Sequence, residues 1–457
     1  MNNTIRKIAF ILVAVMVCFS LLTACGQATE TAPKEPTAQG SDATDKDASG
    51  DTEEAPKEKV TIKFWKYQDE NEQATIEALV EKFNSESETT IVEFESYPWE
   101  QYNGEKITAS IAGGVGPDVF WLSAGDFIKY VANELVLPIN DAFTDDLKQD
   151  FLPASLKAVT VGENIYGVPH EMGVQGIIYD KNLFEAEGIN PPESWDELLT
   201  VARQLKADSR WGLIIPTDPG VFQNFIWYSW LWSAGGDVLD EGWTKARINE
   251  PEGVAALELC GTLVKEGLAS PKGGAPFDAD VAQGKAAMAS LGHWVSDNFT
   301  QNYPDFEMGV APVPPREKGG KSTVAYGGWF SVVNASTKYP EEAKEFAVWL
   351  FGKDTQNAVD LLTPPGTYLS PRKSVMEAVQ QTEYYQQFPH PLFIEKIWPN
   401  TRPEPAYPPE IVTAVTEALQ QVMFGGVDAQ QAADEAAEKI NAFLESDEGA
   451  KIREMLN

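Results

Sequence analysis

Alternating strand and helix patterns near residue 60 constrain the fold of this chain more than any other feature. Apolar and polar residues alternate in residues 60–64, as in a strand with one buried face, and apolar residues then recur at helical spacing. The successive segments are a strand at 60–64, a helix at 71–83, a strand at 90–95, a helix at 102–112 and a strand at 118–122. This order predicts right-handed βαβ units and a mainly parallel sheet covered by helices.

Amphipathic helices are also predicted further along the chain. They lie at residues 194–206, 254–264, 341–351 and 429–444. Ser194 is expected to cap the first of them, because a serine side chain can accept a hydrogen bond from the first helical turn. Cys260 lies inside the second, and we interpret it as a small buried apolar residue and not as a nucleophile.

Five segments resemble, in the same order, the sequence blocks of bacterial extracellular solute-binding proteins of the sugar-binding, maltose-binding type. They are GVGPDVFWL (114–122), YGVPHEMGVQGIIYDKNLFEAEGINPPESWDEL (166–198), WLWSAGGDVLD (230–240), FDADVAQGKAAMASLGHW (277–294) and GGWFSVVNASTKYPEEAKEFAVWL (327–350). Two departures stand out. Asp180 replaces the family's usual Asn, and the aromatic-rich residues 222–232 are not shared widely in the family.

The resemblance implies a two-lobed α/β fold of the periplasmic-binding-protein type. Each lobe would be a mainly parallel sheet flanked by helices, and a multi-strand hinge would join the two. We expect lobe 1 at residues 59–170 and 327–384, and lobe 2 at 171–326 and 385–457. The chain would cross between lobes near residues 169–174, 323–327 and 384–393, and the lobes would close around a ligand.

The N-terminus has the pattern of a secretory signal. Two basic residues precede an apolar run at 8–22, which is short for a membrane span and ends at small residues. The sequence Leu22-Thr23-Ala24-Cys25 resembles a bacterial lipobox, which implies cleavage after residue 24 and a lipid on Cys25. An ordinary cleaved signal is the alternative. Residues 25–58 hold no aromatic residue and many charged ones, so they are predicted to form a disordered acidic linker.

Candidate ligand-binding residues follow from the chemistry of a sugar. A pyranose has two apolar faces and a polar rim, so its site needs aromatic platforms with polar groups at the edge. We expect such roles at Trp65, Tyr67, Trp121, Ser123, His170, Glu171, Gln223, Trp227, Trp294, Trp329, Trp398 and Arg402. Of these, Trp294 matches the family's ligand-stacking position. Core packing is the alternative for each aromatic residue, a hinge ion pair for Glu171, and helix capping for Arg402.

The sequence gives little support for a metal site, a serine hydrolase, a phosphate-binding loop or nucleic-acid binding. The three histidines lack metal-ligand spacing, no G-x-S-x-G motif occurs, and residues 113–116 lack the Lys-Ser/Thr of a P-loop. No catalytic residue, metal or cofactor is therefore predicted. The net charge of −34 argues against nucleic-acid binding. Abundant carboxylates leave a glycosidase pair open.

The resemblance implies a function in solute import. The chain would be a non-enzymatic, monomeric lipoprotein on the outer face of the cell membrane. It would capture a carbohydrate, expected to be an oligosaccharide, and deliver it to the permease subunits of an ABC-type importer. Two alternatives stay open: a lipid-anchored glycoside hydrolase, and a binder of a non-sugar solute such as a polyamine, an amino acid or a metal.

Overall fold

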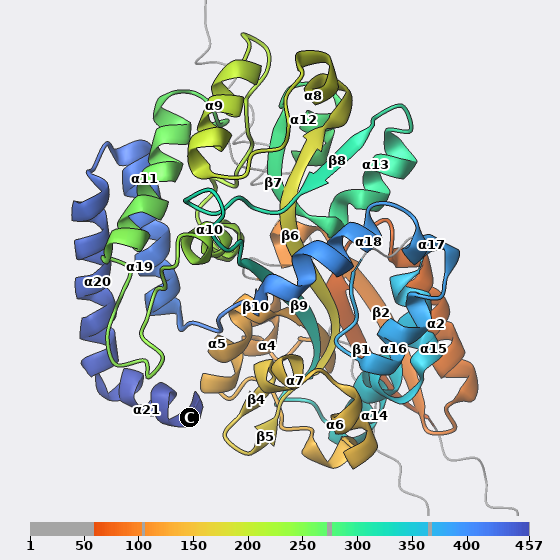
Figure 1. Cartoon of the computed structure of the whole chain (residues 1–457). Coiled ribbons are helices and arrows are strands. Elements are labelled where there is room, and N and C mark those ends of the chain that lie inside the picture. Colours follow the sequence, from red (N-terminus) through yellow and green to blue (C-terminus); the bar gives the residue numbers. More distant parts are fainter. Residues whose placement is uncertain (1–58, 103–105, 272–276, 364–367, 457) are drawn as a thin grey trace, which may run out of the picture. The chain divides into compact units, whose positions relative to one another are not determined.

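A computed structural model describes residues 59–102, 106–271, 277–363 and 368–456 (Figure 1). These residues belong to one folded unit, Lys57–Asn457. The predicted signal, Cys25 and the acidic linker lie outside the described residues.

Ten strands occur in the described ranges, and eight of them form one sheet while β4 and β5 form a small ribbon. The strands are β1 (Val60–Tyr67), β2 (Thr90–Tyr97), β3 (Val119–Ser123), β4 (Thr160–Val161), β5 (Asn164–Ile165), β6 (Val168–Asp180), β7 (Met288–Gly292), β8 (Met308–Ala311), β9 (Val324–Val333) and β10 (Thr401–Pro403). Along the main path the order is β2-β1-β3-β9-β6-β7, with β10 beside β9 and β8 beside β6.

The helices surround these strands (Figure 1). They are α2 (Gln73–Glu86), α3 (Trp99–Gln101), α4 (Ile107–Ala112), α5 (Phe127–Ala132), α6 (Asp145–Asp150), α7 (Pro153–Ala158), α8 (Lys181–Glu187), α9 (Trp195–Leu205), α10 (Val221–Ser233), α11 (Pro251–Lys265), α12 (Phe277–Ala282), α13 (Ser296–Asn302), α14 (Pro340–Val348), α15 (Thr355–Leu362), α16 (Lys373–Val379), α17 (Glu383–Gln386), α18 (His390–Leu392), α19 (Pro409–Gln420), α20 (Ala429–Glu445) and α21 (Asp447–Leu456).

The predicted βαβ start of the fold is confirmed. Strands β1, β2 and β3 are parallel, with Val60 opposite Thr90 and Phe64 opposite Val119. Helix α2 joins the first two strands and buries the apolar face that its spacing predicted, Ile76, Leu79, Val80 and Phe83. Because the strands are parallel, their carboxyl ends meet at one edge of the sheet, which is where binding residues gather in such folds.

Two long strands, β6 and β9, link this group to the strands β7 and β8. We call them the crossing strands. They pair antiparallel with each other, from Val168 opposite Ser331 to Val174 opposite Tyr326. Strand β9 also pairs with β3, and the far end of β6 pairs with β7 and β8. The segments predicted as the first two crossings therefore lie side by side. Residues 384–393 contain α17 and α18 and no strand.

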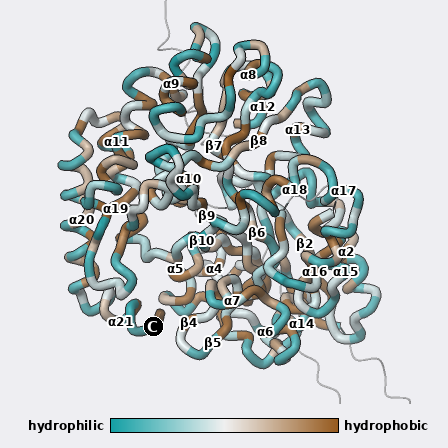
Figure 2. The backbone as a smooth tube through the Cα atoms, viewed as in Figure 1, coloured by the Kyte–Doolittle hydropathy of each residue, from teal (hydrophilic) through white to brown (hydrophobic). Residues whose placement is uncertain are grey.

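The predicted amphipathic helices are present. Ser194 caps α9, accepting a hydrogen bond from the Glu197 backbone at 3.3 Å. Cys260 is buried on α11, as expected. Figure 2 shows hydrophilic and hydrophobic stretches alternating along outer helices such as α20.

Helix α10 was not predicted. It occupies the aromatic-rich segment, and eleven of its thirteen residues are buried. A helix that is hydrophobic on all sides lacks the periodic pattern that reveals a surface helix, and it belongs in a protein interior.

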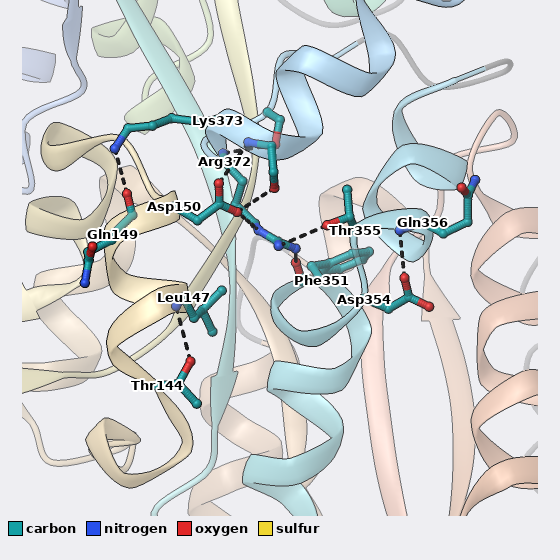
Figure 3. Close-up of polar contacts among 12 residues, drawn as sticks. Thr144, Leu147, Gln149, Asp150, Phe351, Asp354, Thr355, Gln356, Arg372 and Lys373 are labelled. Atoms are coloured by element: carbon teal, nitrogen blue, oxygen red, sulfur yellow. Dashed lines mark hydrogen bonds and ion pairs between the residues drawn. The ribbon is translucent and has the colours of Figure 1, made fainter.

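A buried arginine joins α6 to α15 and α16 (Figure 3). The Arg372 guanidinium donates to Asp150 Oδ2 at 2.7 Å and to the Phe351 carbonyl at 2.8 Å. Asp150 also accepts from the Ser374 backbone and hydroxyl, at 2.8 and 2.7 Å. These contacts satisfy a charge that would be costly to bury unpaired.

Candidate binding site

An aromatic group stands at the carboxyl end of β1, which β3 separates from β9 in the sheet. The ring centroid of Tyr67 lies 4.5 Å from that of Trp329 and 5.2 Å from that of Trp99, while Trp99 and Trp329 are 5.5 Å apart. Tyr67 and Trp329 are buried, whereas Trp99, from the segment after β2, is 45% exposed. The group, Tyr67, Trp99 and Trp329, therefore reaches solvent through Trp99.

Glu171 lies against this aromatic group from β6. Its Oε1 accepts a hydrogen bond from the Tyr67 hydroxyl at 3.4 Å, and its carboxyl, in a residue that is 1% exposed, also shares a side-chain hydrogen bond with Glu72. Beside it, Lys66 and Glu72 form a fully buried ion pair at 2.9 Å. Burial raises the pKa of Glu171 well above its ordinary value, the charge of Glu72 adds to this, and Lys66 opposes it.

Trp121 and His170 lie beneath the aromatic group. Their rings are 4.2 Å apart, and His170 stacks on Phe351 at 4.6 Å. The Lys66 ammonium sits 4.6 Å from the centroids of both Tyr67 and Trp121. Burial holds the pKa of His170 well below its usual range, so its ring is neutral. Both predicted residues thus support the site from within the protein, away from solvent.

Trp294 approaches the same region from the end of β7. Its indole covers two glycines. A methyl group added to Gly292 would come within 1.7 Å of the ring, and one added to Gly173 within 3.1 Å. The Tyr368 ring lies 3.4 Å from the same point on Gly173. Trp294 remains half-buried. The small residues therefore let the indole lie on the crossing strand.

His293 fixes the strand end that carries Trp294. Burial lowers the pKa of His293 to about 3, so its ring is neutral. Its Nδ1 accepts a hydrogen bond from the Val174 backbone on β6 at 3.2 Å. Because this hydrogen bond holds His293 in place, we expect the next residue, Trp294, to have a defined orientation.

A second acid follows Trp294 on α13. Asp297 Oδ1 accepts a hydrogen bond from the Tyr384 hydroxyl at 2.6 Å, and its Oδ2 has no partner although the residue is 6% exposed. Burial raises the pKa of Asp297 to about 6; Tyr384 opposes the shift and the charge of Asp69 adds to it. Asp69, just after β1, also raises the pKa of Glu171. The negative charge of Asp69 therefore raises the pKa of both buried acids, Glu171 and Asp297.

Sequence reasoning missed Asp69, Tyr368, Asp297 and Tyr384. Two of them had a signal in the sequence. Asp69 follows Tyr67 by two residues at a strand end, and Asp297 follows Trp294 by three, one helical turn away. The two tyrosines lie in segments that carried no motif.

Several predicted residues lie away from the aromatic group or face elsewhere. Trp65 packs edge-on against Tyr97, at 4.9 Å. Gln223 and Trp227 on α10 line an apolar pocket together with Cys260. Arg402 pairs with Asp237 at 2.8 Å and lies 4.2 Å over the Trp232 ring.

A second small pocket lies beside the crossing strands. It is lined by Glu171, Gly327 and Glu404 among others. Burial of its carboxyl raises the pKa of Glu404 to about 8, with Asp126 adding to the effect. The predicted residue Ser123 donates to that Asp126, at 3.0 Å. The predicted Trp398 packs near this pocket, 5.2 Å from the Tyr326 ring.

Two kinds of feature are absent from the described ranges. None of their helices combines the length and the apolar character needed to cross a membrane. Nor do these residues group three or more His, Cys, Asp or Glu side chains as a metal ion would require.

Comparisons with known proteins agree with one another. The family model described as "Bacterial extracellular solute-binding protein" matches residues 67–357. A "Putative binding protein" of Brucella abortus is 26% identical over 383 residues, covering 80% of this chain and 89% of that protein. The "Multiple sugar-binding protein" of Streptococcus mutans is 24% identical over 320 residues, covering 65% and 72%. A Thermotoga lettingae solute-binding protein, solved with alpha-D-tagatose, superposes with a TM-score of 0.74 at 23% identity, covering 84% and 99%.

Proposed function

The chain belongs to the family of bacterial extracellular solute-binding proteins, and from this premise we propose that it captures a carbohydrate and delivers it to an ABC-type importer. The relative from Streptococcus mutans carries the name of a sugar-binding protein. The observation that carries the proposal is the position of Trp294, half-buried over Gly173 and facing the region of Tyr368.

The arrangement suits the two surfaces of a sugar ring. The apolar C–H faces stack on the rings of Trp294 and the aromatic group, while rim hydroxyls donate to Glu171 and Asp297. Asp297 has an oxygen without a partner, and satisfying it is worth more than an ordinary hydrogen bond because the group is buried. The ligand would thus complete a contact that the protein leaves open.

Capture includes a domain motion in this proposal. Lobe 1, residues 59–170 and 327–384, and lobe 2, residues 171–326 and 385–457, close around the sugar by bending at the crossing strands. Closure follows only if the ligand binds the closed state better than the open one. Trp294 follows β7, and Tyr67 ends β1. A ligand that touches both side chains at once binds the closed state more tightly than the open one.

The proposal also places the protein outside the cell, held to the outer face of the membrane by a lipid on Cys25. The family is named for extracellular proteins, and residues 1–24 have the pattern of a secretory signal. The body acts as a monomer and binds no nucleic acid.

A ligand screen tests the proposed function. Thermal melting of the purified protein is followed with a panel of neutral mono- and oligosaccharides and with spermidine. At least one sugar should raise the melting temperature, since ligand at 100 times Kd adds about 2.7 kcal/mol of stability. Stabilisation by spermidine alone would refute the carbohydrate assignment.

The family consists of binding proteins. We therefore propose that this chain does not cleave or otherwise react with the carbohydrate it binds. The best-bound oligosaccharide, incubated with the protein and separated by chromatography, should be recovered intact. Cleavage of more than one equivalent would favour a glycoside hydrolase.

A further inference from the structure

The carboxyl of Glu404 occupies a space that two glycines leave open. Glu404 directly follows β10, and its backbone N–H donates to the Tyr326 carbonyl on β9 at 2.8 Å. Its Oε1 lies 2.7 Å from the point where a methyl group on Gly125 would stand, and its Oε2 lies 3.0 Å from the corresponding point on Gly327. The absence of a side chain at both positions therefore lets the backbone approach the carboxyl closely.

This space lies between the two proposed lobes. Gly125 belongs to the turn after β3, in lobe 1, and its methyl position lies 3.6 Å from Cβ of Val221, the first residue of α10 in lobe 2. The methyl position of Gly327 lies 3.0 Å from the Phe225 ring on the same helix. When the lobes part, Gly125 moves away from Val221 and from Glu404, and water reaches the carboxyl.

The groups that face Glu404 favour its neutral form. Burial raises the pKa of Glu404 to about 8, and the negative charge of Asp126, the residue after Gly125, adds to this. Lys129 on α5 acts on Asp126 and lowers its pKa. Helix α10 contributes the phenol of Tyr228, whose own pKa the charge of Glu404 raises.

The remaining neighbours of Glu404 supply no positive charge to it. Arg402 on β10 is paired with Asp237 at 2.8 Å. Glu171 on β6 lines the same pocket and is itself an acid, and none of the described residues that line this pocket is a cation. An ionised Glu404 would therefore lie buried beside other acids, which is unfavourable while the lobes are closed.

We propose that Glu404 forms a pH-sensitive contact between the lobes: as the neutral acid it allows them to close, and as the carboxylate it drives them apart. The inference goes beyond the proposed function and rests only on the proposed motion of the lobes. An acidic medium would thus favour the closed state, which holds the ligand.

The sign of the effect follows from the proton balance of Glu404. Its pKa is about 8 in the closed state, and in the open state water returns it towards its ordinary value of 4.5. Between these values the closed state holds a proton that the open state has released. Closure is therefore most favourable at pH below 4.5 and weakens as pH rises to about 8, by up to about tenfold in the equilibrium constant for each pH unit.

Distances between two spin labels test this contact without any sugar. The labels are attached through Glu81→Cys on α2, in lobe 1, and Gln301→Cys on α13, in lobe 2; both residues are exposed, and both helices lie at the right of Figure 1. The chain also carries Cys18→Ala and Cys25→Ala, and Cys260 is buried. In double electron–electron resonance, the ratio of short to long distances should be roughly tenfold or more higher at pH 5.5 than at pH 8.

The variant Glu404→Gln isolates the contribution of this carboxyl. Its amide has the shape of the neutral acid but does not ionise, so the distance ratio should keep its acid value at both pH values. The control Glu410→Gln changes an exposed acid at the start of α19 and should follow the wild type. Glu171 and Asp297 titrate in all three proteins, so the difference between Glu404→Gln and the other two belongs to Glu404.

Ligand affinity should follow closure. Calorimetric titration with glucose, maltotriose, xylotriose and cellotetraose identifies the tightest of these sugars, and its Kd is then measured at pH 5.5 and 7.5. The ratio of the wild-type Kd to that of Glu404→Gln should rise roughly tenfold or more between the two pH values.

The outcomes separate this inference from the proposed function. A distance ratio that does not depend on pH, or that changes equally in Glu404→Gln, would overturn the role of Glu404 and leave carbohydrate capture standing. A Kd ratio that is the same at both pH values would also overturn it. Absence of binding by every sugar would count against carbohydrate capture alone, because the distance measurement needs no ligand.

Discussion

Replacing Trp294 by alanine tests the site most directly. The indole lies over Gly173 and Gly292 and is half-buried, so it offers a face to a ligand. Truncating a central aromatic anchor costs about 2–4 kcal/mol of binding, which corresponds to roughly 30- to 1,000-fold in Kd. The ligand is the best sugar from the screen, and the assay is calorimetric titration.

Stability of the ligand-free protein distinguishes binding from packing. A fully buried tryptophan costs about 3–5 kcal/mol when it is truncated to alanine. Because Trp294 keeps part of its surface exposed, the loss should be smaller, about 1–2 kcal/mol. Thermal melting of wild type and variant measures this. Unchanged affinity together with a collapsed melting point would show that Trp294 is a core residue and that the reasoning is wrong.

A matched control is available in Trp211, also half-buried, whose backbone pairs with Ala286 before the start of β7. Strand β7 separates it from Trp294. Trp211→Ala should lower stability by a comparable amount without changing Kd. A similar loss of affinity in both variants would mean that the effect passes through folding.

Further changes test the anchor and the stability of the fold. Cys25→Ala should release the protein into the medium, and retention in the membrane fraction would contradict lipidation. Arg372→Met should destabilise the fold by about 3 kcal/mol in chemical denaturation, because it leaves Asp150 and the Phe351 carbonyl without their buried partner, whereas the exposed Lys181→Met should change it by less than about 0.5 kcal/mol. The pKa of Asp297, raised to about 6 from 3.8, means that its ionisation weakens the folded state as pH rises from 4 through 6. Asp297→Asn should therefore gain stability over wild type at pH 8, and the gain should vanish near pH 4; a gain that does not depend on pH would refute the shift.

Local patterns in the sequence determined the regular elements. The alternation in β1 and β2, the apolar spacing of α2 and the serine cap of α9 each involve residues within one turn or one strand, so they can be recognised without the rest of the chain. Helix α10 escaped recognition because all of its sides are apolar. Its place in the interior depends on neighbours that come later in the sequence.

The residues of the candidate site also fall into two groups, those that the sequence indicated and those that only the structure placed there. Strand ends and family blocks pointed to Tyr67, Glu171, Trp294 and Trp329, and their role in binding remains a prediction. Only the tertiary structure placed His170 beneath that layer, because burial is set by what packs around a residue and not by its own position in a motif.

The long-range acid contacts were likewise beyond the sequence. Tyr384 meets Asp297 across 87 residues, and the charge of Asp69 reaches Asp297 from a segment more than 200 residues earlier. No periodicity relates such positions, since the crossing strands and the segments packed on them bring them together only after folding. The sequence by itself therefore determined the elements and the family, while the tertiary structure decided which side chains share the site and which of their polar atoms lack a partner.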